Sequence, residues 1–296
     1  MTRTSHAVGQ ISQLRERYYK ALPGKESLIK IINEAEVGEQ VYNSNAIENS
    51  TLTLEETEKI LLQIDLDRFV SERELFEAKN LARVTEYIES KARESELSPA
   101  TMLLLHKMLI GNIRDDIAGR FRRGDEWVRV GSHIGADPKD VERLITDMLA
   151  AYHGTKDRHI IARIARLHLT FEYIHPFCDG NGRIGRTLNN YELIREGYVP
   201  INIAFANRER YYAAFKEFQE KGGTSIMEEI VGRALTNSYH KRLAYLEGKA
   251  IITLREYAKQ HKLSYSNLIN KSNRQTIPAF REKGAWKISA DTPAAT

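Results

Sequence analysis

The sequence is poor in cysteine: Cys178 is the single one among 296 residues. A lone cysteine excludes a disulfide within the chain, and sparing use of cysteine is typical of proteins in reducing compartments. No apolar run follows Met1, so no signal peptide is visible. No window approaches the roughly 20 consecutive apolar residues that a membrane-spanning helix needs. We therefore expect a cytoplasmic protein without membrane contact.

Strand signals are scarce as well. Apolar residues recur with a helical rhythm over most of the chain, which predicts helices at residues 27–47, 72–91, 158–173, 185–196, 208–219 and 225–246. Capping signals predict further helices that start near Thr53, Pro99 and Pro138. Alternating residues predict a short exposed hairpin that begins at 127–130, and further β structure at 276–277 and 286–288. The predicted fold class is therefore mainly all-α.

Charge is distributed unevenly along the chain. The net charge is +4, which by itself indicates little. Residues 249–287, however, hold nine basic residues and two acidic ones, so the basic character belongs to the C-terminal part. The change in composition at Glu247-Gly248 marks the best domain boundary.

One twelve-residue segment concentrates reactive side chains. Residues 175–186 read His-Pro-Phe-Cys-Asp-Gly-Asn-Gly-Arg-Ile-Gly-Arg. An imidazole, a carboxylate, two glycines around an amide and two guanidinium groups together suit a polyphosphate: a base, a metal ligand, open backbone N–H groups and cationic clamps.

Two other interpretations of this segment are less consistent with its surroundings. Gly180, Gly182 and Gly185 also satisfy the dinucleotide-binding pattern G-x-G-x-x-G, but that pattern needs a preceding strand, and the preceding residues have a helical period. A zinc site from His168, His175 and Asp179 is conceivable, but the chain lacks the cysteine or clustered histidine ligands typical of such sites.

The segment resembles the signature of the Fic family, H-x-F-x-[D/E]-G-N-G-R-x-x-R, at every fixed position. The resemblance extends over roughly residues 30 to 240, including Gly119-Arg120-Phe121-Arg122 upstream and residues 197–198 and 208–212 downstream. It implies a helical Fic-type core with a short β-hairpin flap. It also implies transfer of a nucleoside monophosphate, usually AMP from ATP, to a protein hydroxyl.

The resemblance implies a role for each reactive residue, and the chemistry agrees. His175 would be the general base for an incoming Ser, Thr or Tyr hydroxyl, because imidazole titrates near neutral pH. Asp179 would hold Mg²⁺ against the phosphates, as a hard oxygen ligand suits a hard cation. Backbone and side-chain donors at a helix N-terminus, with the two forked cations, would bind those phosphates. The expected nucleotide contacts in this segment are Gly180, Asn181, Gly182, Arg183 and Arg186.

Other site elements follow from the family alignment. The segment Arg129-Val130-Gly131-Ser132-His133-Ile134-Gly135-Ala136 resembles the flap that aligns the target by strand pairing. Tyr212 and Gln219 would lie near the adenine or ribose, although some relatives carry Asn at the second position. An ordinary hairpin, and a helix-packing role for Tyr212 and Gln219, are the alternatives.

A second motif lies well upstream. Residues 44–49 fit the inhibitory pattern [S/T]-x-x-x-E-[G/N], found N-terminal to the core in one class of Fic proteins. The resemblance implies that Glu48, with Ser44, pairs with Arg186 and places a negative charge where the triphosphate must lie. In some relatives this glutamate also supports removal of AMP from a modified protein.

The C-terminal residues predict a small separate module. Residues 254–259 and 264–269 suggest two helices joined by a turn, and residues 276–288 suggest a β-ribbon with its tip at Lys283-Gly284. This order is similar to winged helix-turn-helix modules of the excisionase type. Its positive charge suits contacts with DNA phosphates. A small appendage that positions a target or supports a dimer fits about equally well.

The sequence thus predicts three segments: an N-terminal helical region at 1–96 with the inhibitory motif, a catalytic core at 97–247 and the basic module at 248–296. The predicted function is Mg²⁺-dependent transfer of AMP from ATP to a protein, held back by Glu48. A DNA-binding regulator with a Fic sensor core, and removal of AMP, are the alternatives. The target, self-modification and a homodimer are left open by the sequence.

Overall fold

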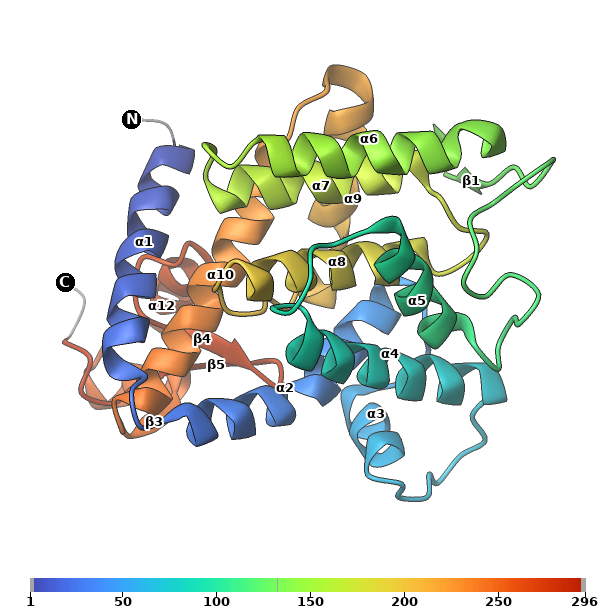
Figure 1. The fold of residues 1–296 in the computed structure, drawn as a ribbon. Coiled ribbons are helices and arrows are strands. Elements are labelled where there is room, and N and C mark those ends of the chain that lie inside the picture. Colours follow the sequence, from blue (N-terminus) through green and yellow to red (C-terminus); the bar gives the residue numbers. More distant parts are fainter. Residues whose placement is uncertain (1–2, 132, 294–296) are drawn as a thin grey trace. The chain divides into compact units, whose positions relative to one another are not determined.

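The computed structural model describes residues 3–131 and 133–293 (Figure 1). Its helices are α1 (Arg3–Ala21), α2 (Glu26–Ile47), α3 (Leu54–Leu61), α4 (Glu72–Lys91), α5 (Pro99–Ile110), α6 (Val141–Gly154), α7 (Ile160–Ile174), α8 (Asn181–Arg195), α9 (Arg208–Lys221), α10 (Ser225–Leu246), α11 (Leu254–Gln260) and α12 (Tyr265–Asn273). Its strands are β1 (Arg129–Val130), β2 (His133–Ile134), β3 (Ile251–Thr253), β4 (Phe280–Glu282) and β5 (Ala285–Ser289). The mainly helical fold class is confirmed.

Local signals account for many of the element boundaries. Thr53 and Glu56 form the expected capping box before α3, and the Ser98 hydroxyl caps α5 with Pro99 in its first turn. Helix α1 was not among the helices predicted from the sequence. The predicted start of α8 was four residues too late, because Gly180, with φ +80°, ends the preceding loop and lets a helix begin at once.

One predicted β segment is wrong. Residues 276–277 do not form a strand, because the Thr276 N–H donates to the carbonyl of Lys271 and Pro278 follows. The ribbon instead pairs Phe280–Glu282 with Ala285–Ser289, and Lys283-Gly284 form its tip as expected.

The chain divides into two compact units. One comprises residues 37–198 and 202–230, and the other comprises residues 1–36, 199–201 and 231–296. These units are defined by packing and are not consecutive in the sequence. The three consecutive segments expected from the sequence, 1–96, 97–247 and 248–296, stay a prediction. In the part of the chain that is described, no helix is both long and apolar enough to cross a membrane.

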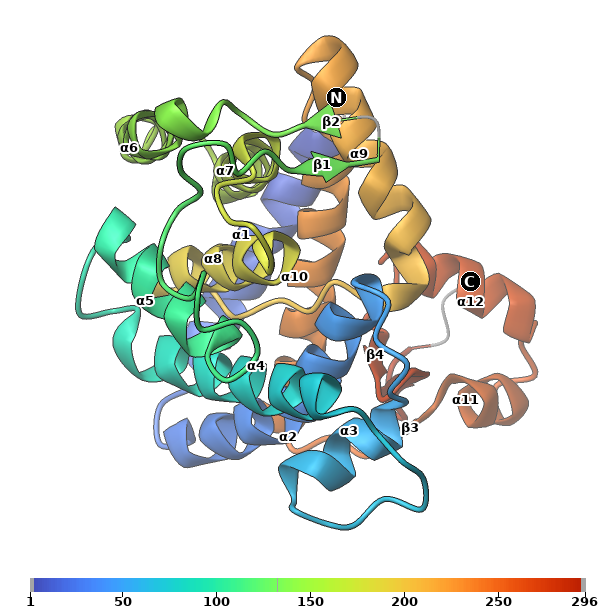
Figure 2. The ribbon, with the colours of Figure 1, turned by 90° about the vertical axis from the view of Figure 1, so that its right-hand side faces the viewer.

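The first unit is built around α7 and α8, which lie against each other at its centre. Helices α6 and α9 pack on α7, while α4 and α5 pack on α8 (Figures 1 and 2). The two central helices bury apolar side chains such as Ile164, Phe171, Ile184 and Leu188. Burial of each such side chain contributes roughly 1.5–3 kcal/mol. The loop between them, residues 175–180, is therefore held by well-packed helices at both of its ends.

The second unit contains the basic C-terminal residues. Strands β3, β5 and β4 form an antiparallel sheet in that order, and α11 and α12 lie between β3 and β4 in the sequence. A small core unites this sheet with its helices; it includes Leu254, Tyr257, Leu268 and Ile288. The order of strand, two helices and two strands suits a winged helix-turn-helix module, which stays a prediction.

Candidate functional site

The loop that carries the reactive residues begins with a constrained backbone. Helix α7 ends at Ile174, and the next residue, His175, has a φ of 52° and a ψ of 62°, in the left-handed region. The His175 N–H still donates to the carbonyl of Phe171, at 2.9 Å. A non-glycine residue adopts this conformation only where its surroundings hold it, and such residues cluster at functional sites.

Buried side chains fix the shape of the loop. Phe177 is fully buried and stacks on the His106 ring, with ring centroids 3.8 Å apart. His106 Nδ1 accepts from the Gly119 N–H at 3.0 Å, so its Nε2–H donates to the carbonyl of Asp179 at 3.1 Å. Burial lowers the pKa of His106 to about 4, which keeps this ring neutral as the two contacts require.

Asn181 closes the same loop on itself. Its side-chain oxygen accepts from the Phe177 N–H, and its side-chain nitrogen donates to the Phe177 carbonyl, both at 2.8 Å. These two contacts hold the Asn181 side chain in the loop and use one of its two Nδ2 hydrogens; a contact of Asn181 with a phosphate stays a prediction. The first backbone N–H groups of α8, at Asn181 and Gly182, have no acceptor within the helix and suit an anion.

Arg122 is a residue of this site whose role the sequence did not indicate. Its side chain is 2% exposed and donates to four carbonyls: His175 at 2.7 Å, Ala136 at 2.8 Å, Glu126 at 2.9 Å and Ile174 at 3.2 Å. Two of these acceptors lie at the end of α7, and the other two flank the hairpin. One guanidinium group thus fixes the loop at residues 175–180 and the base of the hairpin together.

We expect Arg122→Gln to lower the free energy of unfolding by about 3 kcal/mol, because several buried carbonyls would be left without donors. Chemical denaturation of the full chain measures this change. The neighbouring exposed Arg123 provides a matched control, and Arg123→Gln should change stability by no more than about 0.5 kcal/mol. Equal stability of the two variants would show that Arg122 does not hold the loop.

Asp179 and Arg183 belong to a closed ring of charges with α4. Arg73 Nη2 lies 2.7 Å from Asp179 Oδ2, and Arg183 Nη2 lies 3.2 Å from Asp179 Oδ1. Glu77 Oε1 accepts from Arg73 Nε at 3.0 Å and forms an ion pair with Arg183 Nη1, also at 3.0 Å. The sequence predicted Asp179 and Arg183 but neither α4 partner.

The side chains that could bind a metal near Asp179 limit which metal fits this site. Mg²⁺ is commonly held by one or two carboxylates together with substrate phosphates. Asp179, with a quarter of its side chain exposed, supplies one such carboxylate. Among residues 3–131 and 133–293, no group of three or more His, Cys, Asp or Glu could hold a metal ion. The site therefore fits a metal that arrives with a polyphosphate and does not fit the zinc alternative.

Arg186 meets both residues of the upstream motif. Its Nη2 lies 2.9 Å from Glu48 Oε1 and donates to the Ser44 carbonyl, while its Nε donates to the Ser44 hydroxyl, each at 2.9 Å. Nη1 donates to the Tyr211 hydroxyl at 3.1 Å. Burial disfavours the charged guanidinium, but Tyr211 and Glu48 outweigh this effect and raise the pKa of Arg186. The predicted contact between Glu48, Ser44 and Arg186 is present in the structure.

Glu48 also stands at the first turn of α8. A Cβ atom on Gly182 would lie 2.1 Å from Glu48 Oε1, so only glycine leaves room for this carboxylate. The Glu48 carboxylate thus occupies the kind of place, at a helix N-terminus, where a phosphate is expected.

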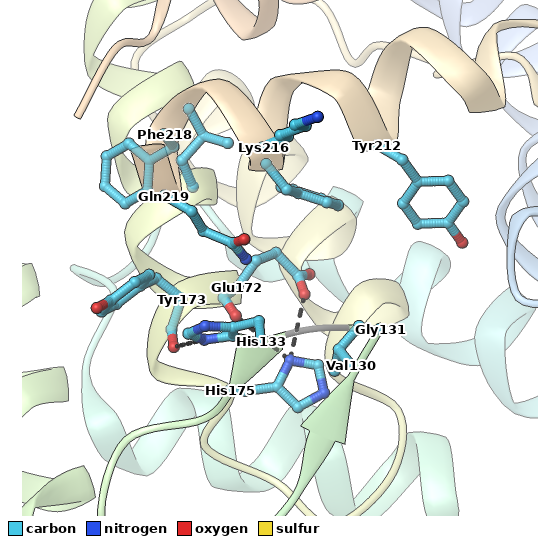
Figure 3. A pocket seen from close by; sticks show the side chains of 12 residues that line it. Val130, Gly131, His133, Glu172, Tyr173, His175, Tyr212, Lys216, Phe218 and Gln219 are labelled. Atoms are coloured by element: carbon cyan, nitrogen blue, oxygen red, sulfur yellow. Dashed lines mark hydrogen bonds and ion pairs between the residues drawn. The ribbon is translucent and has the colours of Figure 1, made fainter. Parts of the chain in front are cut away.

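A cavity of about 400 Å³ lies beside His175 (Figure 3). The flap contributes Val130, Gly131 and His133, and helix α9 contributes Tyr212 and Gln219, so these predicted residues do share one space with the imidazole. Ser132 lies outside the described residues. The remaining flap residues, Arg129, Ile134, Gly135 and Ala136, are near in sequence and do not line this cavity.

The hairpin itself is short and partly anchored. Arg129 pairs with Ile134 and Val130 pairs with His133. At the base, the Ala136 N–H donates to the Ile174 carbonyl at 3.1 Å. Nearer the tip, His133 Nε2 lies 2.7 Å from the Tyr173 carbonyl. The outward strand edge that could pair with an extended peptide stays a prediction.

Glu172 is a further cavity residue that the sequence did not single out. Its Oε2 lies 3.6 Å from His175 Nδ1, and its backbone carbonyl lies 3.4 Å from the same nitrogen (Figure 3). Burial would raise the pKa of Glu172, but His175 and His168 outweigh burial and lower it, so the carboxylate is ionised. In the sequence, the spacing of three residues between Glu172 and His175 at the end of α7 was the signal that could have indicated this contact. The arrangement directs Nδ1 of His175 to Glu172 and leaves Nε2 for chemistry.

Comparison with known proteins identifies the family. The Fic/DOC family model matches residues 96–193. The chain is 30% identical over 223 residues to "Protein adenylyltransferase Fic" of Drosophila ananassae, covering 70% of this chain and 44% of that protein. It is 30% identical over 214 residues to the protein of the same name from Nematostella vectensis, covering 69% and 48%. The chain therefore spans less than half the length of these two relatives.

Solved structures share the fold. A Fic-domain signalling protein from Bacteroides thetaiotaomicron matches 81% of this chain and 98% of its own, with a TM-score of 0.73 and 24% identity. Fic-1 from C. elegans matches 83% and 73%, with a TM-score of 0.72 and 24% identity. The Fic/DOC family model matches this region, and the complete signature lies on the loop between α7 and α8 and the start of α8. The chain therefore belongs to the Fic/DOC family through a domain at residues 96–193.

Proposed function

We propose that this protein transfers AMP from ATP to a hydroxyl side chain of a protein. The observation that carries the proposal is the position of His175: its imidazole lines a cavity between flap and α9, and the N-terminus of α8 with its two arginines follows within one short loop. Both curated relatives are named protein adenylyltransferase, which agrees with the proposal.

In the proposed reaction the target hydroxyl attacks the α-phosphorus of ATP. The new bond joins that oxygen to the α-phosphorus, the bond from the α-phosphorus to the bridging oxygen breaks, and pyrophosphate leaves. His175 Nε2 accepts the hydroxyl proton, while Nδ1 stays directed to Glu172. The ionised Glu172 favours the imidazolium that results.

The remaining residues would bind and orient the donor. The N–H groups at the start of α8 would donate to the α- and β-phosphates, and Arg183 and Arg186 would contact the β- and γ-phosphates. Asp179 would hold Mg²⁺, which supplies charge neutralisation as pyrophosphate leaves. Tyr212 and Gln219, on the cavity wall, would contact the adenine or ribose.

Labelled ATP tests the proposal directly. The full chain, incubated with cell lysate and ATP labelled at the α-phosphate, should transfer label to protein, whereas label at the γ-phosphate should remain in pyrophosphate. Transfer from the γ-position would indicate a phosphotransferase instead. Label on the chain itself would identify self-modification, and removal of label from a purified modified target would identify the reverse reaction.

A second candidate function concerns DNA. Residues 249–287 carry a marked excess of basic residues, and the observed order β3-α11-α12-β4-β5 suits a winged module. Arg255, Lys259, Lys262 and Arg274 are exposed there, and the Arg255 guanidinium lies 5.2 Å from the centre of the Tyr265 ring. We propose that this surface contacts DNA phosphates.

The full chain should retard a labelled DNA duplex at low salt, with affinity falling steeply as salt rises. Replacing Lys259 and Lys262 by Gln should weaken binding and reduce the slope against salt by about one for each phosphate that the protein no longer neutralises. Lys139→Gln, an exposed change in the other unit, is the control. Absence of retardation at low salt would leave an appendage or dimer support as the better explanation.

A further inference from the structure

The contacts around Asp179 leave it little freedom to bind a cation. Both carboxylate oxygens already face guanidinium groups: Oδ2 faces Arg73 and Oδ1 faces Arg183. The contact to Arg73 is the shorter, at 2.7 Å against 3.2 Å. A divalent cation and a guanidinium on the same carboxylate would repel each other at contact distance. Coordination of a metal by Asp179 therefore competes with Arg73.

Arg73 has a second ion-pair partner, which it would keep if it left Asp179. Its Nε donates to Glu77 Oε1 at 3.0 Å, one turn further along α4. Arg73 is also about half exposed, whereas Arg183 is almost completely buried and meets Glu77 as well. Release of Asp179 would thus leave Arg73 paired and partly hydrated, and Arg183 fixed. Arg73, and not Arg183, is therefore the arginine that can leave Asp179.

The first turn of α4 is itself well anchored. The Ser71 hydroxyl caps the helix, and Glu74 accepts from the Thr51 N–H at 2.8 Å and from the Thr51 hydroxyl at 2.9 Å. The helix start is thus tied to the segment that directly follows Glu48. Arg73 projects from this anchored turn onto the loop of the catalytic residues, 106 positions away in sequence.

We propose that Arg73 is a positioning residue that holds Asp179 until a divalent cation displaces it, and so sets the metal requirement of the site. The inference rests on the proposed function, because that function assigns Asp179 to the metal. In the absence of the metal, Arg73 keeps the carboxylate oriented and compensates its charge. In its presence, Arg73 turns to Glu77 alone.

Binding of ADP with and without Mn²⁺ tests the inference without relying on turnover. ADP lacks the γ-phosphate that would meet Glu48. Mn²⁺ should strengthen ADP binding roughly five times more in Arg73→Gln than in wild type. A factor of this size corresponds to the loss of one half-exposed ion pair. Binding of ADP in EDTA should not change. Isothermal titration of the full chain gives both affinities.

Two further variants sharpen the result. Arg73→Lys keeps the positive charge but not the two-pronged guanidinium, so its Mn²⁺ effect on ADP binding should lie between those of wild type and Arg73→Gln. If Arg73→Gln does not fold, Arg73→Lys still tests the inference. Arg143→Gln, which removes two exposed ion pairs, to Asp140 and to Asp147, should match wild type throughout. An unchanged Mn²⁺ effect in both Arg73 variants would overturn the inference. Weaker ADP binding in EDTA would overturn it as well, by making Arg73 a phosphate ligand.

The outcome separates this inference from the proposed function. If the Mn²⁺ effect grows as expected and no variant transfers AMP, the proposed function is wrong and the role of Arg73 stands. If AMP is transferred and the Mn²⁺ effect does not change, Arg73 has no part in metal binding. If no variant binds ADP with Mn²⁺, both proposals are wrong.

Discussion

Glu48→Gly should raise AMP transfer about 10- to 100-fold. Two unit charges at 4 Å attract by roughly 4 kcal/mol at an effective dielectric of 20. Glu48 is about one-third exposed, so screening and desolvation reduce the net contribution to about 1.5–3 kcal/mol. Removing the carboxylate would free Arg186 for the γ-phosphate and empty the N-terminus of α8 for an anion. The rate of label transfer from α-labelled ATP measures the effect.

The residue beside Glu48 supplies the matched control. Asn49 has a φ of 71°, which glycine adopts readily, and its side chain contacts Arg208 rather than Arg186. Asn49→Gly loosens the same turn and keeps the carboxylate, so it should not activate transfer. Glu48→Gln removes the charge but still fills the place beside Gly182, so it should activate transfer less than Glu48→Gly does. Equal rates in wild type and Glu48→Gly would disprove the inhibitory role of Glu48.

His175→Ala in the Glu48→Gly background should reduce transfer by about 100- to 10,000-fold, the range for removal of a general base. The effect should fall on kcat, because the imidazole acts on the hydroxyl proton and not on the phosphates. Single-turnover label transfer, with ADP affinity measured in parallel, distinguishes the two steps.

A second histidine controls for the removal of a ring. His133 lies on the flap and contacts the Tyr173 carbonyl, so His133→Ala should affect target alignment and change transfer far less. If His175→Ala retained most of the activity, the base would have to be sought elsewhere on the cavity wall.

The sequence predicted the parts of the site that lie close together along the chain. The end of α7 and the loop follow from local signals, an apolar helical period and then glycines and charged groups, whereas the start of α8 was placed four residues too late. The role of Asn181 did not follow, because the pattern shows an amide but not that both of its polar atoms bind Phe177.

Residues that act through tertiary packing were not predictable. Arg73 and Glu77 resemble an ordinary surface pair on a helix, and only the packing of α4 on α8 brings them to Asp179 and Arg183. Arg122 stood in a motif shared with the family, but its four acceptors come from segments that meet only in the fold. The contact of Glu48 with Arg186 was expected from the family resemblance, since no local rule joins residues 138 positions apart.

If Glu48 is inhibitory as proposed, its close approach to Gly182 limits which substitutions could activate AMP transfer. Any side chain at position 182 would push the carboxylate away, but it would fill the same place that the nucleotide needs. Changes at Arg186 or Tyr211 would likewise damage the donor site while they weaken the contact. A genetic screen for unregulated variants should therefore return substitutions at Glu48 and Ser44, and few or none on the helix that faces them.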